Sequence, residues 1–195
     1  MTLGFQSELW WVRCLFANLA APPCGGASDD CGQRVQMATY SVCFPESWQV
    51  YRRASDDRVS GCNHRTDPCT QKSGGAPVPG AVFIFLMPAE NVPGHPHYSD
   101  VRDIVSQYPQ IDESGQVIEP PLSAVAIEGD KDKKCLVSRS LVPGKVWSEV
   151  YGLRVEGRLF RCWAQYRDES DQIEEYRATI ARILSAVSVR GAGHH

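Results

Sequence analysis

Apolar and polar side chains alternate most regularly in the second half of the chain. Three stretches, 134–141, 145–155 and 158–166, show the period of two that is typical of β-strands. The dipeptides Pro143-Gly144 and Glu156-Gly157 stand at the two junctions and are typical of tight turns. The pattern therefore predicts three consecutive antiparallel strands joined by hairpins.

The spacing also predicts the register of these hairpins. Centring the second one on Glu156-Gly157 brings apolar residues together on one face. The expected pairs are Leu153 with Phe160, Tyr151 with Cys162, and Trp147 with Tyr166. In the first hairpin, the same pairing rule sets Cys135 opposite Gly152. Cys135 and Cys162 should then lie on opposite faces of the sheet, too far apart to form a disulfide. We expect both to be buried thiols.

Shorter extended segments precede these strands. Residues 39–44 alternate and end at Pro45, and residues 49–51 form a second extended piece. Residues 81–87 are an uninterrupted apolar run bounded by Gly80 and Pro88. Such a run between breakers predicts a central strand that is buried on both faces.

Apolar residues at helical spacing predict two helices. A short one starts at Ser99-Asp100, in the middle of the chain, and a longer one follows the acidic residues 168–171, whose charges suit the positive end of a helix dipole. The apolar stripe of the second helix consists of Ile173, Tyr176, Ile180, Ile183, Leu184 and Val187; its expected solvent side carries Glu174, Glu175, Arg177 and Arg182.

The polar, Gly- and Pro-rich stretches set the expected domain limits. We expect a leader-like segment and linker over 1–34, one domain over 35–190 and a tail over 191–195. Residues 52–80 are expected to be a long polar insertion. The fold class is α+β: a curled antiparallel sheet packed by the C-terminal helix and the mid-chain helix.

Composition narrows the function classes. The chain has 195 residues, 43% hydrophobic and 22% charged, with a formal net charge of −3. No basic stripe of the kind that neutralises phosphates is visible, so no nucleic-acid partner is expected. No apolar run reaches the length of a transmembrane helix. We also expect no cofactor.

The N-terminal region and the cysteines bear on the compartment. Residues 9–21 are apolar and end in small residues, like a secretory leader, although a misassigned start or a loosely packed helix is an alternative. The even number of cysteines, eight, favours disulfides in an extracytoplasmic protein. The local candidate pairs are Cys24 with Cys31 and Cys62 with Cys69.

Two clusters contain metal-ligand chemistry. Cys62, His64 and Cys69 are zinc-ligand types, but a second ligand pair is missing from the spacing, which favours a disulfide loop. His95, His97 and Asp100 form the candidate metal site, since alternating histidines can point the same way in an extended segment. The competing interpretation is an exposed, Pro-rich loop.

Known catalytic motifs are absent from the sequence, so we expect no catalytic residues. There is no Gly-x-Ser-x-Gly elbow, no cysteine within a catalytic signature and no phosphate-binding glycine loop. A candidate partner surface is formed by Arg161 and Trp163, which face away from the predicted core side of their strand and are exposed if the mid-chain helix leaves that face open.

The order of elements resembles the PsbP-like family, which includes the Mog proteins. The resemblance covers about 35–189 and rests on the step Phe44-Pro45-Glu46-Ser47-Trp48, the hairpin 155–160 and the final helix 176–187. It implies an α/β/α sandwich that works by binding larger assemblies rather than by catalysis.

These observations lead to one expectation and two alternatives. We expect a non-catalytic binding or accessory domain, exported or associated with the cell envelope, whose protein partner contacts the 52–80 insertion and the 88–98 loop. The first alternative is a metal-binding protein or hydrolase that uses His95 and His97. The second is a cytoplasmic partner-binding protein of the Mog type.

Overall fold

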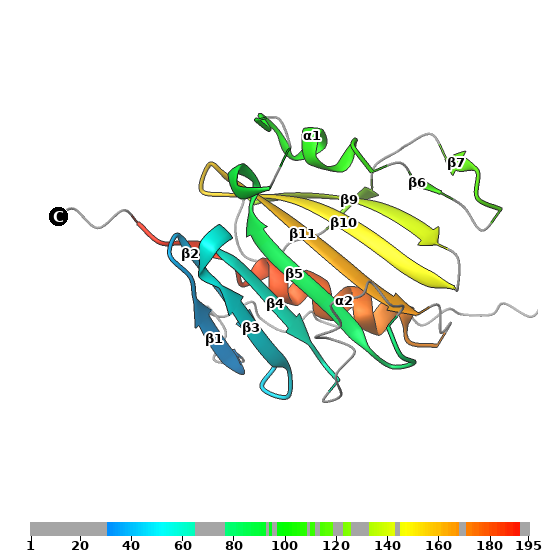
Figure 1. Cartoon of the computed structure of the whole chain (residues 1–195), viewed down its shortest axis with the longest axis horizontal. Coiled ribbons are helices and arrows are strands. Elements are labelled where there is room, and N and C mark those ends of the chain that lie inside the picture. The colour runs from blue at the N-terminus through cyan, green and yellow to red at the C-terminus, as the bar shows by residue number, and fades with distance from the viewer. Residues whose placement is uncertain are drawn as a thin grey trace, which may run out of the picture.

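The computed structural model describes residues 31–64, 77–92, 94, 97–108, 110–111, 114–118, 123–125, 133–142, 145–167 and 171–191. These residues form a three-stranded sheet, a nine-stranded sheet and two α-helices, with the strands mostly antiparallel (Figure 1). The expected α+β fold with a curled antiparallel sheet is confirmed.

The nine-stranded sheet is the centre of the fold. Its strand order is β3-β4-β5-β11-β10-β9-β6-β7, and β8 also pairs with β9. All its pairings are antiparallel except that of β6 with β9. The strands are β3 (Gln49–Arg53), β4 (Arg58–Cys62), β5 (Val82–Pro88), β6 (Gln110–Ile111), β7 (Val117–Ile118), β8 (Ser123–Ala124), β9 (Lys134–Val142), β10 (Val146–Val155) and β11 (Arg158–Arg167).

The hairpin of β10 and β11 has the predicted register. Leu153 lies opposite Phe160, Tyr151 opposite Cys162 and Trp147 opposite Tyr166. Glu156 and Gly157 both have positive φ, as the predicted two-residue turn requires.

The register of β9 against β10 differs from the prediction by one residue. Cys135 lies opposite Leu153, not Gly152, because the loop includes Lys145 at a φ of 55° and is three residues long. Cys135 and Cys162 therefore share a face, and their predicted opposite orientation is wrong. Both are buried free thiols, as expected, and burial raises the pKa of Cys135 to about 12.

The expectation that residues 52–80 form a polar insertion is wrong for β4, which belongs to the large sheet. β5 is a central strand, as predicted, but β4 pairs with it from within the supposed insertion. One side of β4 is buried although most of its side chains are polar. Val59 is fully buried, and a Cβ at Gly61 would lie 2.3 Å from the Phe44 ring. Part of that segment, 65–76, lies outside the described residues.

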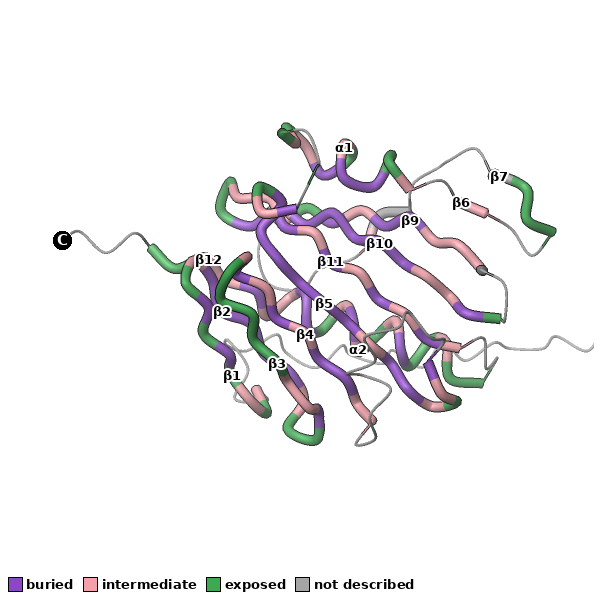
Figure 2. Tube along the Cα trace, in the orientation of Figure 1, coloured by how far each residue is buried: buried purple, intermediate pink, exposed green. Residues whose placement is uncertain are grey.

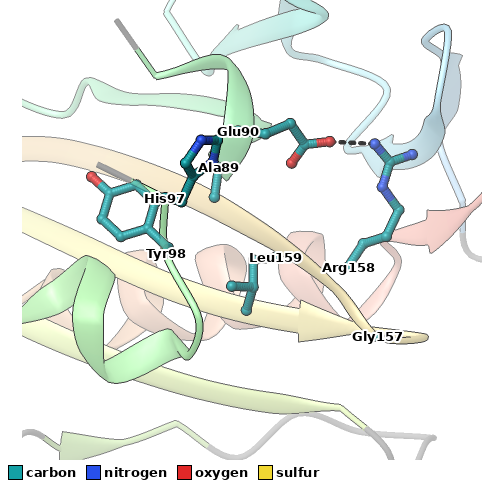
Figure 3. A pocket seen from close by; sticks show the side chains of 7 residues that line it. All are labelled: Ala89, Glu90, His97, Tyr98, Gly157, Arg158 and Leu159. Atoms are coloured by element: carbon teal, nitrogen blue, oxygen red, sulfur yellow. Dashed lines mark hydrogen bonds and ion pairs between the residues drawn. The ribbon is translucent and has the colours of Figure 1, made fainter. Parts of the chain in front are cut away.

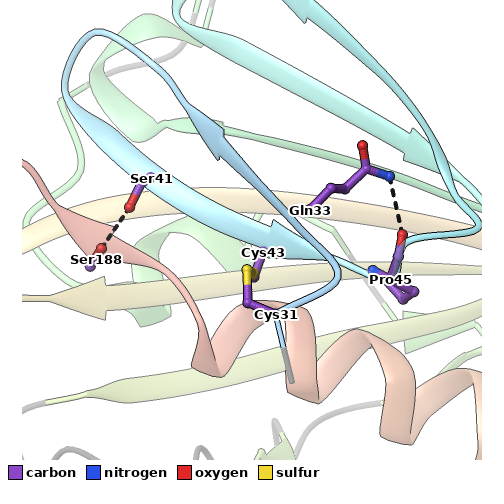
Figure 4. The surroundings of a disulfide bond; sticks show 6 residues. All are labelled: Cys31, Gln33, Ser41, Cys43, Pro45 and Ser188. Carbon is purple, nitrogen blue, oxygen red and sulfur yellow. Dashed lines mark hydrogen bonds between the residues drawn. A yellow bond between two sulfur atoms is a disulfide. The ribbon is translucent and has the colours of Figure 1, made fainter. Parts of the chain in front are cut away.

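The three-stranded sheet joins segments from the two halves of the chain. β1 (Gln33–Gln36) and β12 (Ser188–Val189) each pair antiparallel with β2 (Tyr40–Phe44). Ser41 and Ser188 share a hydrogen bond of 2.8 Å across this sheet (Figure 4). β1 begins at Gln33, two residues before the predicted domain start at residue 35.

A disulfide fastens the start of this sheet. It joins Cys31 to Cys43 of β2, with 5.5 Å between their Cα atoms (Figure 4). The predicted pairing of Cys31 with Cys24 is therefore wrong: the β1–β2 hairpin folds Cys31 back toward Cys43. Cys24 itself lies outside the described residues.

The helices pack on opposite faces of the large sheet. α2 (Ile173–Ser185) buries its predicted apolar stripe in the main core, together with the inward side chains of β5, β10 and β11 (Figures 1 and 2). α1 (Val101–Val105) starts at the N-cap Asp100, as predicted, and packs on β10. It approaches so closely that a Cβ at Gly152 would lie 2.5 Å from the Val101 carbonyl oxygen.

Removing the disulfide should weaken the fold measurably. The bridge closes a loop across a sequence separation of 12, and such loops contribute about 3 kcal/mol to the free energy of unfolding. We expect the Cys31→Ser/Cys43→Ser variant to lose about that amount in urea denaturation. The control is Cys135→Ser, which leaves the bridge intact, and reductant should destabilise this control more than the double variant, which keeps only the disulfide of Cys62.

Candidate functional site

The large sheet has two distinct faces. The inner face packs on α2. We call the opposite side the outer face, defined by Arg58 and Ser60 of β4, Phe83, Phe85 and Met87 of β5, and Arg161, Trp163 and Gln165 of β11. The pairing of Trp163 with Phe85, and of Phe85 with Ser60, brings these side chains together.

Arg161 is held between aromatic rings on the outer face. Its guanidinium carbon lies 5.6 Å from the ring centroid of Phe85 and 5.1 Å from that of Tyr108. These distances are typical of cation–π contacts. Its Nε is buried and has no hydrogen-bond partner among the described residues. The two rings therefore hold this guanidinium in place.

Arg58 approaches Phe85 from the neighbouring strand. Its guanidinium carbon is 5.5 Å from the ring centroid, and within the part of the chain that the structure describes its Nε also has no hydrogen-bond partner. The nearest carboxylate is that of Asp56, 3.9 Å away, which binds Arg53 more closely. Burial and the charge of Arg53 together lower the pKa of Arg58, so Asp56 compensates its charge incompletely.

Trp163 completes the aromatic part of the outer face. Its ring packs edge-on against Phe85, with 5.0 Å between centroids, and its indole N–H donates to Ser148 Oγ at 2.7 Å. Tyr98 also packs against this cluster. Trp163 is half-buried, so the segment 97–108 with α1 covers the predicted partner surface in part and leaves the rest accessible.

A pocket of about 300 Å³ lies beside the outer face, near the β10–β11 turn. Figure 3 shows His97 and Tyr98 on one side, Leu159 at the centre and the Glu90–Arg158 ion pair on the other side. The structure thus places one of the predicted site residues, His97, in a pocket built from the β5–α1 connection and β11.

The predicted metal site is brought together only in part. His95 lies outside the described residues, and His97 lines the pocket. Asp100 caps α1 by accepting from the Arg102 N–H at 3.0 Å, and its carboxylate also binds Arg154 and Lys134. The described part of the chain holds no group of three or more His, Cys, Asp or Glu side chains arranged for a metal.

Cys62 has a structural role. It is fully buried and disulfide-bonded, so its sulfur is not a thiolate ligand for zinc. Its predicted partner, Cys69, lies outside the described residues, and the Cys62–Cys69 pairing stays a prediction.

The inner face contains a buried charge cluster that the sequence analysis missed. Glu149 is completely buried and accepts hydrogen bonds from Arg139 Nε at 2.9 Å and Arg177 Nε at 3.0 Å. The hydroxyl groups of Tyr151 and Tyr166 donate to the same carboxylate. A charge buried in this way is stable only when it is paired and hydrogen-bonded.

Arg177 links this cluster to α2. Burial alone lowers its pKa, but the charge and hydrogen bonds of Glu149 outweigh burial and raise it. Arg177 also lies 5.2 Å from the Trp147 ring centroid. The expectation that Arg177 faces solvent is therefore wrong. The alternation of β10 already places Glu149 on the same face as Trp147 and Tyr151, a signal that could have identified it.

Neutralising Glu149 should destabilise the protein strongly. Glu149→Gln leaves two guanidinium groups facing an uncharged amide, and breaking a buried pair costs about 3 kcal/mol or more. We expect that loss in urea denaturation. The matched control is Glu174→Gln, an exposed partner of Arg177 on α2, which should cost less than about 0.5 kcal/mol. Equal effects of the two substitutions would contradict the structural importance of the buried pair.

Comparisons with known proteins identify no family. No protein-family model matches the chain, and no curated protein matches it. One solved structure, a crystal structure from Bacteroides thetaiotaomicron VPI-5482 at 1.50 Å resolution, is similar with a TM-score of 0.44 and 12% sequence identity. The match covers 80% of this chain and 46% of that chain, so this chain spans less than half the length of that protein.

Proposed function

We propose that the chain is a non-catalytic binding domain that acts through protein–protein contacts on its outer face. The observation that carries the proposal is the cluster of Phe85, Arg161 and Trp163, together with Arg58. Tryptophan, tyrosine and arginine are the side chains that contribute most binding energy at protein interfaces. Here they lie side by side on a sheet face that is only partly covered by α1 and residues 97–108.

The fixed geometry of the cluster supports binding. Each large side chain is already held by a neighbour: Arg161 by two rings, and Trp163 by Ser148. Binding therefore costs less conformational entropy than it would at a flexible surface, because these side chains are already ordered. The adjoining pocket at His97 and Leu159 extends the same surface toward the β10–β11 turn.

Blocking the outer face should release the partner. Ser60 of β4 lies opposite Phe85 on this face, so Ser60→Trp introduces a bulky ring beside Phe85 without removing a core side chain. We expect wild-type protein from its own cells to migrate as part of a larger complex in native gel filtration, and the variant to migrate alone.

The control is Glu175→Trp, which adds the same ring to the exposed side of α2 on the opposite face of the sheet. This variant should keep the complex. A monomeric wild-type protein, or a complex that survives Ser60→Trp, would overturn the proposal.

We further propose that the domain works outside the cytoplasm. The Cys31–Cys43 disulfide supports this location, because disulfides persist in oxidising compartments and are rare in the cytosol. No helix in the described ranges is long and apolar enough to cross a membrane.

Thiol trapping in intact cells tests the location. We expect Cys31 and Cys43 to resist alkylation until reductant is added, and the protein to fractionate with the envelope or the medium. Cys135, buried but reduced, serves as an internal control that is alkylated after unfolding without reduction. Open thiols at Cys31 and Cys43, in a cytosolic fraction, would contradict export.

A further inference from the structure

The outer face carries positive charge that the described part of the chain does not balance. The other half-buried arginines of the described residues each have an acceptor: on the inner face Arg139 and Arg177 bind Glu149, and elsewhere Arg154 binds Asp100, Arg158 binds Glu90 and Arg167 donates to the Pro77 carbonyl. Among the described residues Arg161 has aromatic neighbours, and its buried Nε has no hydrogen-bond partner there. Arg58 has only the distant contact with Asp56.

Arg58 and Arg161 form a pair because they approach the same ring. Their guanidinium carbons lie 5.5 Å and 5.6 Å from the centroid of Phe85. The two charges are therefore no further apart than the sum of these distances. An extended peptide places alternate side chains on one side about 7 Å apart, a spacing that lies within this upper limit.

The chemistry of the pair selects a carboxylate ligand. A guanidinium that packs against aromatic rings keeps its N–H donors for acceptors, and carboxylates match the guanidinium geometry. Phe83 and Trp163 are half-buried and add apolar surface beside the charges, next to the buried ring of Phe85. A small anion would leave this surface uncovered, whereas a polypeptide would bury it.

We infer that the outer face binds an extended acidic segment of a partner protein, with two of its carboxylates paired to Arg58 and Arg161. This inference rests on the proposed function and specifies the chemistry of the partner. Complementary charge should also make the association salt-dependent, because the paired groups are only partly buried.

A defined acidic peptide tests the inference. We would titrate the full chain with a ten-residue peptide of alternating glutamate and threonine and follow binding by calorimetry. The glutamine–threonine peptide of the same length measures the contribution of charge. We expect the acidic peptide to bind, its affinity to fall as salt is raised, and the neutral peptide to bind at least about tenfold more weakly.

Matched variants locate the binding. Arg161→Gln should weaken binding of the acidic peptide about tenfold, and Arg58→Gln/Arg161→Gln should weaken it further. Arg182→Gln removes the same charge from the exposed side of α2 and should change the affinity less than about twofold. Ser60→Glu keeps both arginines and places a carboxylate of the protein itself beside them. This carboxylate should compete with the acidic peptide for the arginines and weaken its binding. Ser60→Gln, which adds no charge, should not compete.

The outcomes separate this inference from the proposed function. Equal losses for Arg161→Gln and Arg182→Gln, or equal affinity for inorganic phosphate and for the peptide, would overturn the acidic-segment inference. So would the absence of peptide binding. If the native complex is nevertheless lost on Ser60→Trp, the outer face binds a partner of different chemistry and only the inference fails. If the complex persists, the proposed function fails as well.

Discussion

The pairing of β10 with β11 determines which side chains lie on which face of the large sheet. Ten consecutive residue pairs hold these strands in one register, from Val146 with Arg167 to Val155 with Arg158. Because side chains alternate between faces, a slip of β11 by one residue would move Cys162 out of the core and Trp163 into it. Packing against α2, the coverage by α1 and the composition of the outer face all depend on this register.

Arg177 on the inner face and Arg161 on the outer face are held in different ways. On the inner face, Arg139 and Arg177 are neutralised by Glu149, whose carboxylate also accepts from two tyrosines. On the outer face, Arg161 is held by aromatic rings, and no carboxylate of the described residues pairs with it. The inner arrangement is complete within the chain and ties α2 to β10, whereas the outer arrangement is completed only by a further molecule under our proposal.

Local pattern predicted the features that depend on local spacing. The apolar run of β5, the Glu156-Gly157 turn and the stripe of α2 all follow from residues near one another in the chain. The register of β9 did not, because the sequence Pro143-Gly144-Lys145 does not reveal that Lys145 belongs to the loop. One residue of loop length decides which face Cys135 occupies.

The candidate site was less predictable because its contacts are long-range. Glu149 meets Arg177 across 28 positions, and nothing near Arg177 in the sequence distinguishes it from the solvated charges of α2. β4 is polar at alternate positions, so its place inside the sheet depends on Phe44 packing against Gly61. Arg161 and Trp163 were identified from alternation, but their contacts with Tyr108 and Tyr98 required the tertiary structure.

The small sheet has a consequence for how the protein is made. β12 pairs with β2, and the hydrogen bond between Ser41 and Ser188 spans 147 positions. During synthesis, β1 and β2 emerge from the ribosome long before β12, so β2 keeps one edge open while most of the chain is translated. A strand edge exposed for that interval is a site of aggregation or chaperone capture. Completion of this sheet is therefore necessarily a late event in the maturation of the nascent chain.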